Sequence, residues 1–124
     1  MSTIFTKIIK GEIPAYKIYE DEKTYAFLDN NPKTRGHVLV VPKIEVDKVY
    51  DLPDDYYAAL WDSVKKVCHR LEEVYHTRAL IQVMGTDVPH SHVHVFPLDE
   101  TWEPGRHLSF TPEEYEEIRK ELAF

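Results

Sequence analysis

The chain has 124 residues, of which 43% are hydrophobic and 30% are charged, so it is long enough for one globular domain and too short for two. Its formal net charge of −7 at pH 7 disfavours nonspecific binding to nucleic acid, and a phosphorylated ligand must be attracted by local groups. Because no apolar run approaches the length of a membrane span and no signal-peptide pattern opens the chain, we expect one cytoplasmic domain over 1–124 that binds neither nucleic acid nor membrane.

In the first half of the chain, apolar spacing and turn residues predict a short helix and three strands. Apolar residues at helical spacing mark the helix over 4–9, which Gly11 ends. Apolar runs indicate strands over 16–19, 24–28 and 37–41, separated by charged and turn-rich segments.

A long helix opens at Pro53 in the second half. Its apolar residues recur at helical spacing, namely Leu60, Val64, Val67, Leu71 and Val74. A strand over 79–83 leads through Gly85 into a further strand, and Pro112 begins a final helix with Thr111 as its N-cap. Short strands combined with few helices predict an α+β fold on an antiparallel sheet of about five strands.

The histidine row, defined as His90, His92 and His94, is the most informative feature of the sequence. It lies within the run 88–97, whose other residues are mostly apolar. Residues two apart share a face of a strand, so a strand over this run would align the three imidazoles on one side. With seven histidines in 124 residues, chance would give this pattern in roughly 0.02 cases. The row therefore indicates that the imidazole side chains at these positions have a function.

Three interpretations of the row remain open on the residues alone. The first is a solvated polar strand face. The second is a metal site, because imidazole is a common metal ligand, although three successive same-face side chains of a straight strand do not easily converge within about 2.1 Å of one ion. The third makes one histidine a nucleophile whose neighbours hydrogen-bond a phosphate, and a linear row fits that ligand better.

The pattern His-x-His-x-His followed by apolar residues resembles the signature of the histidine triad (HIT) superfamily of nucleotide hydrolases and transferases, in its HINT-like bacterial branch. Earlier segments are similar to that family in its usual order, namely 4–14, 19–21, 26–29, 31–32 and 36–43. The resemblance implies a HIT-like sheet with a long helix and short N- and C-terminal helices. It also implies a homodimer.

The resemblance assigns catalytic roles to four histidines. It implies that His92 attacks the α-phosphorus of a nucleotide and forms a covalent nucleotidyl-histidine, which water then hydrolyses. Imidazole suits this role, because its neutral form has a free lone pair near pH 7. The carbonyl of His90 is expected to fix the tautomer of His92. His94 and His37 are expected to contact phosphate oxygens and to stabilise the charged transition state.

The resemblance also implies a nucleotide-binding site. Asp29 is similar to the carboxylate that binds the ribose hydroxyls, although the residue alone is typical of a turn. Apolar positions are expected to enclose the base, which the family prefers to be a purine, and without the resemblance they are plain core. These positions are Ile4, Phe5, Ile8, Phe27, Leu28 and Leu39.

Two departures from the family pattern are visible. Many bacterial relatives hold a structural zinc ion at positions that correspond here to Thr3, Thr6, Glu45 and His90, so three of the four ligands are missing and we expect no metal and no cofactor. Thr86 stands where many members have a glutamine that contacts the phosphate or the leaving group. Its hydroxyl can replace part of that contact, and the leaving group stays open.

Three functions follow from the resemblance. The favoured one is hydrolysis of nucleoside 5′-phosphoramidates or related nucleotide conjugates, which releases the nucleoside monophosphate. The second is hydrolysis of dinucleoside polyphosphates by the same nucleophile. The third is a nucleotide-binding adaptor with vestigial catalysis, against which the intact histidines argue.

The segment 56–80 predicts self-association. It carries more large apolar residues than a single small core needs, among them Tyr57 and Trp61. An isologous interface requires such a patch, because a two-fold axis brings the same surface together from both chains. The alternative is that Tyr57 and Trp61 cap the monomer's own core.

Overall fold

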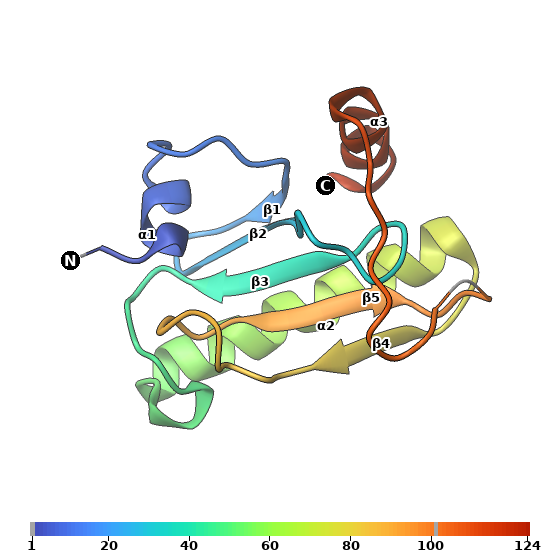
Figure 1. Cartoon of the computed structure of the whole chain (residues 1–124). Helices are drawn as coiled ribbons and strands as arrows, with labels where there is room; N and C mark the ends of the chain where they lie inside the picture. Colours follow the sequence, from blue (N-terminus) through green and yellow to red (C-terminus); the bar gives the residue numbers. More distant parts are fainter. Residues whose placement is uncertain (1, 101) are drawn as a thin grey trace.

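The computed structural model describes residues 2–100 and 102–124, which form one antiparallel sheet and the helices around it (Figure 1). In chain order the elements are α1 (Ile4–Ile9), β1 (Lys17–Glu20), β2 (Thr24–Leu28), β3 (Val38–Pro42), the 3-10 helix η1 (Val49–Asp51), α2 (Asp54–Tyr75), β4 (Ala79–Gln82), β5 (Val93–Pro97) and α3 (Pro112–Leu122). The strand order in the sheet is β1-β2-β3-β5-β4, and all neighbours are antiparallel. The predicted α+β fold is confirmed.

The two faces of the sheet carry different helices. Helix α2 lies along one face, and α1 packs on the other (Figure 1). Because successive strand residues point to opposite faces, Ala26 and Val40 pack toward α2. Their neighbours Phe27 and Leu39 pack toward α1. The sheet therefore separates a larger apolar cluster under α2 from a smaller one under α1.

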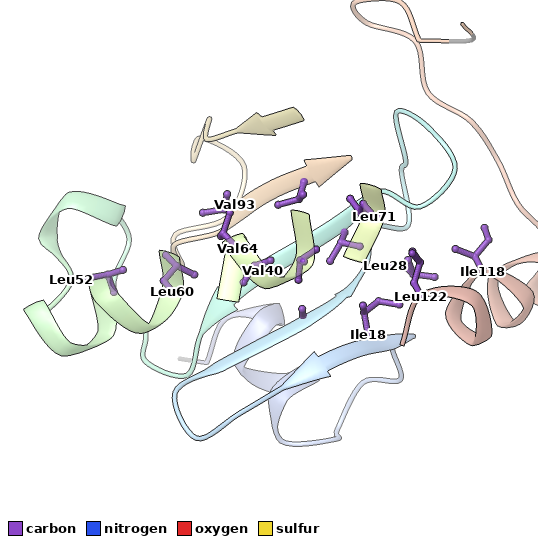
Figure 2. Close-up of a cluster of buried hydrophobic side chains, with 14 residues drawn as sticks. Ile18, Leu28, Val40, Leu52, Leu60, Val64, Leu71, Val93, Ile118 and Leu122 are labelled. Atoms are coloured by element: carbon purple, nitrogen blue, oxygen red, sulfur yellow. The ribbon is translucent and has the colours of Figure 1, made fainter. Parts of the chain in front are cut away.

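The larger cluster explains the length of α2. Figure 2 shows Val64 of this helix close to Val40 and Val93 of the central strands, with Leu60 on one side of them and Leu71 on the other, near Leu28. The three helix residues are 0%, 2% and 1% exposed. Burial of a side chain of this size contributes about 1.5–3 kcal/mol. The apolar spacing that predicted the long helix thus marks its buried face.

The strand that carries the histidine row is shorter than predicted. Strand β5 includes His94 but neither of the other two histidines. Pro89 has no amide hydrogen to donate to a strand neighbour, and the amide of His90 donates to the carbonyl oxygen of Val88, 2.8 Å away. The expectation of three imidazoles along one strand face is wrong, because a loop precedes β5.

The last helix begins as predicted. The Thr111 side chain accepts the amide of Glu114, and the Glu114 side chain accepts the amide of Thr111, which together form a capping box. Ile118 and Leu122 of α3 are buried in the larger cluster. In the part of the chain that the structure describes, no helix has both the length and the hydropathy needed to cross a membrane.

Candidate active site

His92 lies in the loop directly before β5, where the residue is 1% exposed. Its Nδ1 is 2.7 Å from the carbonyl oxygen of His90. A carbonyl oxygen only accepts hydrogen bonds, so Nδ1 carries a proton and Nε2 is the nitrogen left for chemistry. This hydrogen bond is the one that the family resemblance implies for His90.

A second contact of His92 involves a residue that the sequence motif did not single out. Oδ1 of Asp87 is 3.1 Å from Nε2 of His92. Asp87 lies in the loop between β4 and β5, and its side chain is 68% exposed. An acidic residue in the loop leading into a row of histidines is the signal that points to it.

His90 is buried, and both of its ring nitrogens are hydrogen-bonded. Nε2 is 2.9 Å from the carbonyl oxygen of Pro42 at the end of β3, so this nitrogen carries the proton. Nδ1 then accepts the hydroxyl of Thr3, 2.8 Å away. Burial lowers the pKa of His90, which favours the neutral ring. His90 therefore connects the N-terminal segment and β3 to the loop that holds His92.

The four positions compared with a zinc site converge in space. The amide of Thr3 donates to Oε1 of Glu45 at 2.8 Å, and its hydroxyl accepts the amide of Thr6 at 3.1 Å while contacting His90. A hydrogen bond from Thr6 lowers the pKa of the Glu45 carboxyl. Structural zinc sites use thiolates and imidazoles, whereas two hydroxyls stand here and Nδ1 of His90 is already engaged. These residues do not fit a structural zinc ion, and hydrogen bonds join them instead.

His37 and His94 form a hydrogen-bonded pair next to His92. The amide of Lys33 donates to Nδ1 of His37 at 2.9 Å, so the proton of the neutral ring lies on Nε2. This Nε2 is 2.9 Å from Nδ1 of His94, which must accept. Burial lowers the pKa of His37 and favours its neutral form. His94 consequently carries its own proton on Nε2. The centroid of its ring is 5.3 Å from that of His92.

This pairing differs from the expectation for His37. Both of its ring nitrogens are hydrogen-bonded within the protein, and the residue is 1% exposed. His37 therefore has no ring nitrogen left for a phosphate oxygen, and only His94 retains a free donor. The role that the geometry leaves to His37 is to hold the ring and the proton of His94.

Asp29 directly follows β2 and faces both of these histidines. Its Oδ1 accepts the amide of Asn31 at 3.0 Å, which is the turn contact that the residue type predicts. Its Oδ2 lies 3.4 Å from Nε2 of His37 and 3.6 Å from Nδ1 of His94. Burial raises the pKa of Asp29, but the adjacent His94 and His37 outweigh burial and lower it. Asp29 is therefore an ionised carboxylate at the edge of the site.

Asp29, His37 and His94 form a set of potential metal ligands that the sequence pattern did not indicate. Their ligand-type atoms all lie within 4.8 Å of one another. However, Nδ1 of His94 accepts the proton of His37, so an ion bound there would have to break that hydrogen bond. The expected absence of a metal stays a prediction.

An apolar surface lies next to His92 on the α1 side of the sheet. Phe5 contacts Phe27 edge to face, with ring centroids 5.7 Å apart, and its centroid is 5.1 Å from that of His92. The buried members of this surface are Phe5, Ile8, Phe27, Leu39 and Val41. Ile4 lies on the same helix and is 47% exposed. The structure thus gathers on this side all but one of the residues expected around the base.

Leu28 is the exception. It follows Phe27 in β2, so its side chain points to the opposite face of the sheet. There it belongs to the larger cluster under α2 (Figure 2). The expectation that Leu28 encloses the base is wrong for this reason.

A cavity of ≈ 250 Å³ opens beside His92. The loop after β4 forms one part of its wall with Val83, Met84, Gly85 and Thr86, and the segment 47–50 forms another. Phe5 and Phe27 are not among the lining residues, so the cavity is distinct from the apolar surface. Thr86 is exposed and shares this wall with His92.

The chain is similar in sequence to several known proteins. A family model described as the HIT domain matches residues 10–101. An uncharacterized HIT-like protein of Methanocaldococcus jannaschii is 42% identical over 99 residues, which cover 76% of this chain and 77% of that protein. The adenosine 5′-monophosphoramidase of Saccharomyces cerevisiae is 36% identical over 98 residues, which cover 76% of this chain and 61% of the yeast enzyme.

The fold has the same kind of relatives among solved structures. A zinc-bound histidine triad family protein from Mycobacterium smegmatis is similar with a TM-score of 0.79 and 33% sequence identity. The similarity covers 98% of this chain and 91% of that chain.

Proposed function

Because this chain belongs to the HIT family, we propose that it hydrolyses nucleoside 5′-phosphoramidates or related nucleotide conjugates and releases the nucleoside monophosphate. The observation that carries the proposal is the hydrogen bond from Nδ1 of His92 to the carbonyl of His90, because it reserves Nε2 for attack on phosphorus. The name of the yeast relative, adenosine 5′-monophosphoramidase, supports the same reaction class.

The reaction has two steps on one phosphorus atom. Nε2 of His92 attacks the α-phosphorus, the phosphorus–nitrogen bond breaks, and the leaving nitrogen takes up a proton and departs as an amine. Water then attacks the nucleotidyl-histidine, and the bond between phosphorus and Nε2 breaks. Charge grows on the phosphate oxygens in both steps, and the proton on Nε2 of His94 is the donor beside them. The hydrogen bond from His37 supports this role, since it holds that tautomer.

The nucleoside part of the substrate is proposed to lie on the α1 side of the sheet. The apolar surface meets the ring of His92 through Phe5, so a base bound there lies close to the nucleophile. Ile4 forms its exposed edge, and the ionised carboxylate of Asp29 can accept the ribose hydroxyls. On the other side, the hydroxyl of Thr86 can hydrogen-bond the phosphate or the leaving group from the cavity wall.

A homodimer is the proposed assembly, with β4 and α2 at the two-fold axis. Strand β4 lies at the edge of the sheet, where Ile81 is 50% exposed. Tyr57 of α2 is 45% exposed, which supports its role in an interface. Trp61 packs partly against the larger cluster, so this residue fits the alternative of a cap on the monomer's own core.

The experiment that tests the function is intact-mass spectrometry of the protein mixed with substrate and quenched in mild base. We expect an added nucleotidyl mass with an adenosine 5′-phosphoramidate in the wild type and none in His92→Ala. The variant should keep its affinity for AMP within several-fold, because the contacts to base and ribose lie elsewhere. Turnover by His92→Ala at the wild-type rate would refute the assignment of His92 as the nucleophile.

The same assay separates the alternatives. Dinucleoside polyphosphates run beside the phosphoramidate identify the preferred leaving group by relative turnover. A protein that binds AMP but forms no adduct with any substrate of the panel would be a nucleotide-binding adaptor.

A further inference from the structure

The contact between Asp87 and His92 requires a proton whose position matters for the chemistry. Nδ1 of His92 already carries one proton, which it donates to the carbonyl of His90. An ionised carboxylate only accepts, and an unprotonated Nε2 also only accepts. The 3.1 Å separation of Oδ1 and Nε2 is therefore a hydrogen bond when one further proton lies between them. A proton on Nε2 blocks the nitrogen that must attack phosphorus, so it has to leave before the attack.

We propose, on the basis of the function proposed above, that Asp87 is a catalytic residue that carries this proton between His92 and the leaving group. In the first step Asp87 takes the proton from Nε2, and Nε2 forms its bond to phosphorus. The phosphorus–nitrogen bond breaks, its electron pair stays on the leaving nitrogen, and Asp87 protonates that nitrogen to give a neutral amine.

The second step returns Asp87 to its starting state. The carboxylate removes a proton from the attacking water, and the water oxygen forms its bond to phosphorus. The bond between phosphorus and Nε2 breaks, and the electron pair returns to Nε2. The proton taken from water then lies between Asp87 and His92 again, so no further acid or base is needed over the cycle.

Two of the histidines near His92 have no ring nitrogen left for proton transfer. His90 and His37 each use both ring nitrogens within the protein. Asp87, by contrast, has a side chain that is 68% exposed, so its carboxylate has room to move between His92 and the leaving group. Asp87 does not line the cavity, but it contacts His92, which does, and it directly follows Thr86 in the cavity wall.

A proton carrier matters most for leaving groups that need a proton. An alkylamine cannot depart as an amide anion in water, whereas 4-nitrophenolate departs as a stable anion. Two substrates with the same AMP part and these two leaving groups therefore separate proton transfer from a general loss of structure.

The test is Asp87→Asn with the adenosine 5′-phosphoramidate of propylamine and with the 4-nitrophenyl ester of AMP. Release of each leaving group is measured in a single turnover with enzyme in excess, so only the first step is observed. We expect a loss of about 100-fold or more with the amine and a change within about fivefold with the ester. Because the second step also loses its base, the nucleotidyl-enzyme should accumulate when the ester is in excess.

Asp51→Asn is the matched control. Asp51 is exposed in η1, and the substitution removes the same charge without touching His92. It should leave both rates unchanged. An equal loss with the two substrates in Asp87→Asn, or no loss with the amine, overturns the role of Asp87 while the function stands. Failure of the wild type to release either leaving group overturns the proposed function itself, and the role of Asp87 with it.

Discussion

Gly36 lies against the ring of Tyr75, and a Cβ atom added to Gly36 would be 2.6 Å from Cε2 of that ring. The contact joins the residue directly before His37 to the last turn of α2. Gly36 also has a backbone φ of +89°, which residues with a side chain rarely adopt. Two separate constraints therefore require glycine beside the histidine pair.

Gly36→Ala should destabilise the protein and reduce turnover. The strained φ and the contact with Tyr75 together should cost about 2–4 kcal/mol of unfolding free energy, measured by urea denaturation. Gly11→Ala is the control, because Gly11 has a φ of +78° and a methyl group added there would meet nothing within 4 Å. It should cost only about 1–2 kcal/mol and leave turnover intact. Equal losses in the two variants would contradict the role of the Tyr75 contact.

Stability should fall as the pH is lowered below about 6.5. Burial lowers the pKa of His37 and of His90 from 6.5 in the native state, so the unfolded chain binds protons first as the pH falls. Each buried histidine therefore contributes stability that is present above pH 6.5 and is lost below it, by up to about 1.4 kcal/mol per pH unit.

Urea denaturation between pH 7.5 and 5.0 measures this dependence. His37→Gln should reduce the slope by close to one proton, whatever its effect on stability at pH 7.5. His69→Gln, at an exposed position of α2, should leave the slope unchanged. A slope that stays the same in His37→Gln would show that His37 is not held neutral.

Thr3→Val should weaken the support of His92 from a distance. The substitution removes the hydroxyl that Nδ1 of His90 accepts and leaves a buried acceptor unpaired, at about 1–3 kcal/mol. Turnover should fall more than affinity for AMP does, because the side chains of the apolar surface are unchanged and α1 loses only the cap that this hydroxyl provides. Thr3→Ser restores the hydroxyl and should recover both stability and turnover. Failure of the serine variant to recover them would show that the hydroxyl does not account for the loss.

Activity should not require a metal ion. The cluster of Thr3, Thr6, Glu45 and His90 does not fit zinc, and Nδ1 of His94 is engaged by His37. Elemental analysis should find substoichiometric zinc, and turnover should survive dialysis against a chelator. Stoichiometric zinc whose removal abolishes turnover would contradict this expectation and direct attention to Asp29, His37 and His94.

Light scattering at micromolar concentration should give twice the chain mass of 14.6 kDa. Ile81→Glu places a charge on the exposed edge of β4 and should shift the protein toward the monomer. Ser109→Glu adds the same charge to an exposed position outside the sheet and should leave the mass unchanged. A compact, fully active wild-type monomer would rule out the dimer.

The elements of the fold could be predicted because their signals are local. The apolar spacing in α2, the cap at Thr111 and the short apolar strands each depend on a few neighbouring residues. The start of β5 could not be predicted in this way. The amide of Ser91 donates to the carbonyl of Val46, a partner 45 positions away, which holds the preceding loop out of the sheet.

The candidate site was predictable to the extent that it follows one motif. The family resemblance of the row pointed to His92 and to the carbonyl of His90, which belong to the same short segment. Leu28 was misplaced, since the resemblance ignored the alternation that puts it opposite Phe27. The pairing of His37 with His94 depends on the antiparallel register of β3 and β5, and the contact of Asp87 depends on the path of an exposed loop.

The hydrogen bond between Thr3 and His90 also has a consequence for how the molecule matures during synthesis. The two residues are 87 positions apart, so the ribosome adds the histidine several seconds after the threonine at about 5–20 residues per second. Strands β1 to β3 and helix α2 are already synthesised by then. The N-terminal segment cannot settle until the loop before β5 emerges, and catalytic competence should therefore be among the last properties that the nascent chain acquires.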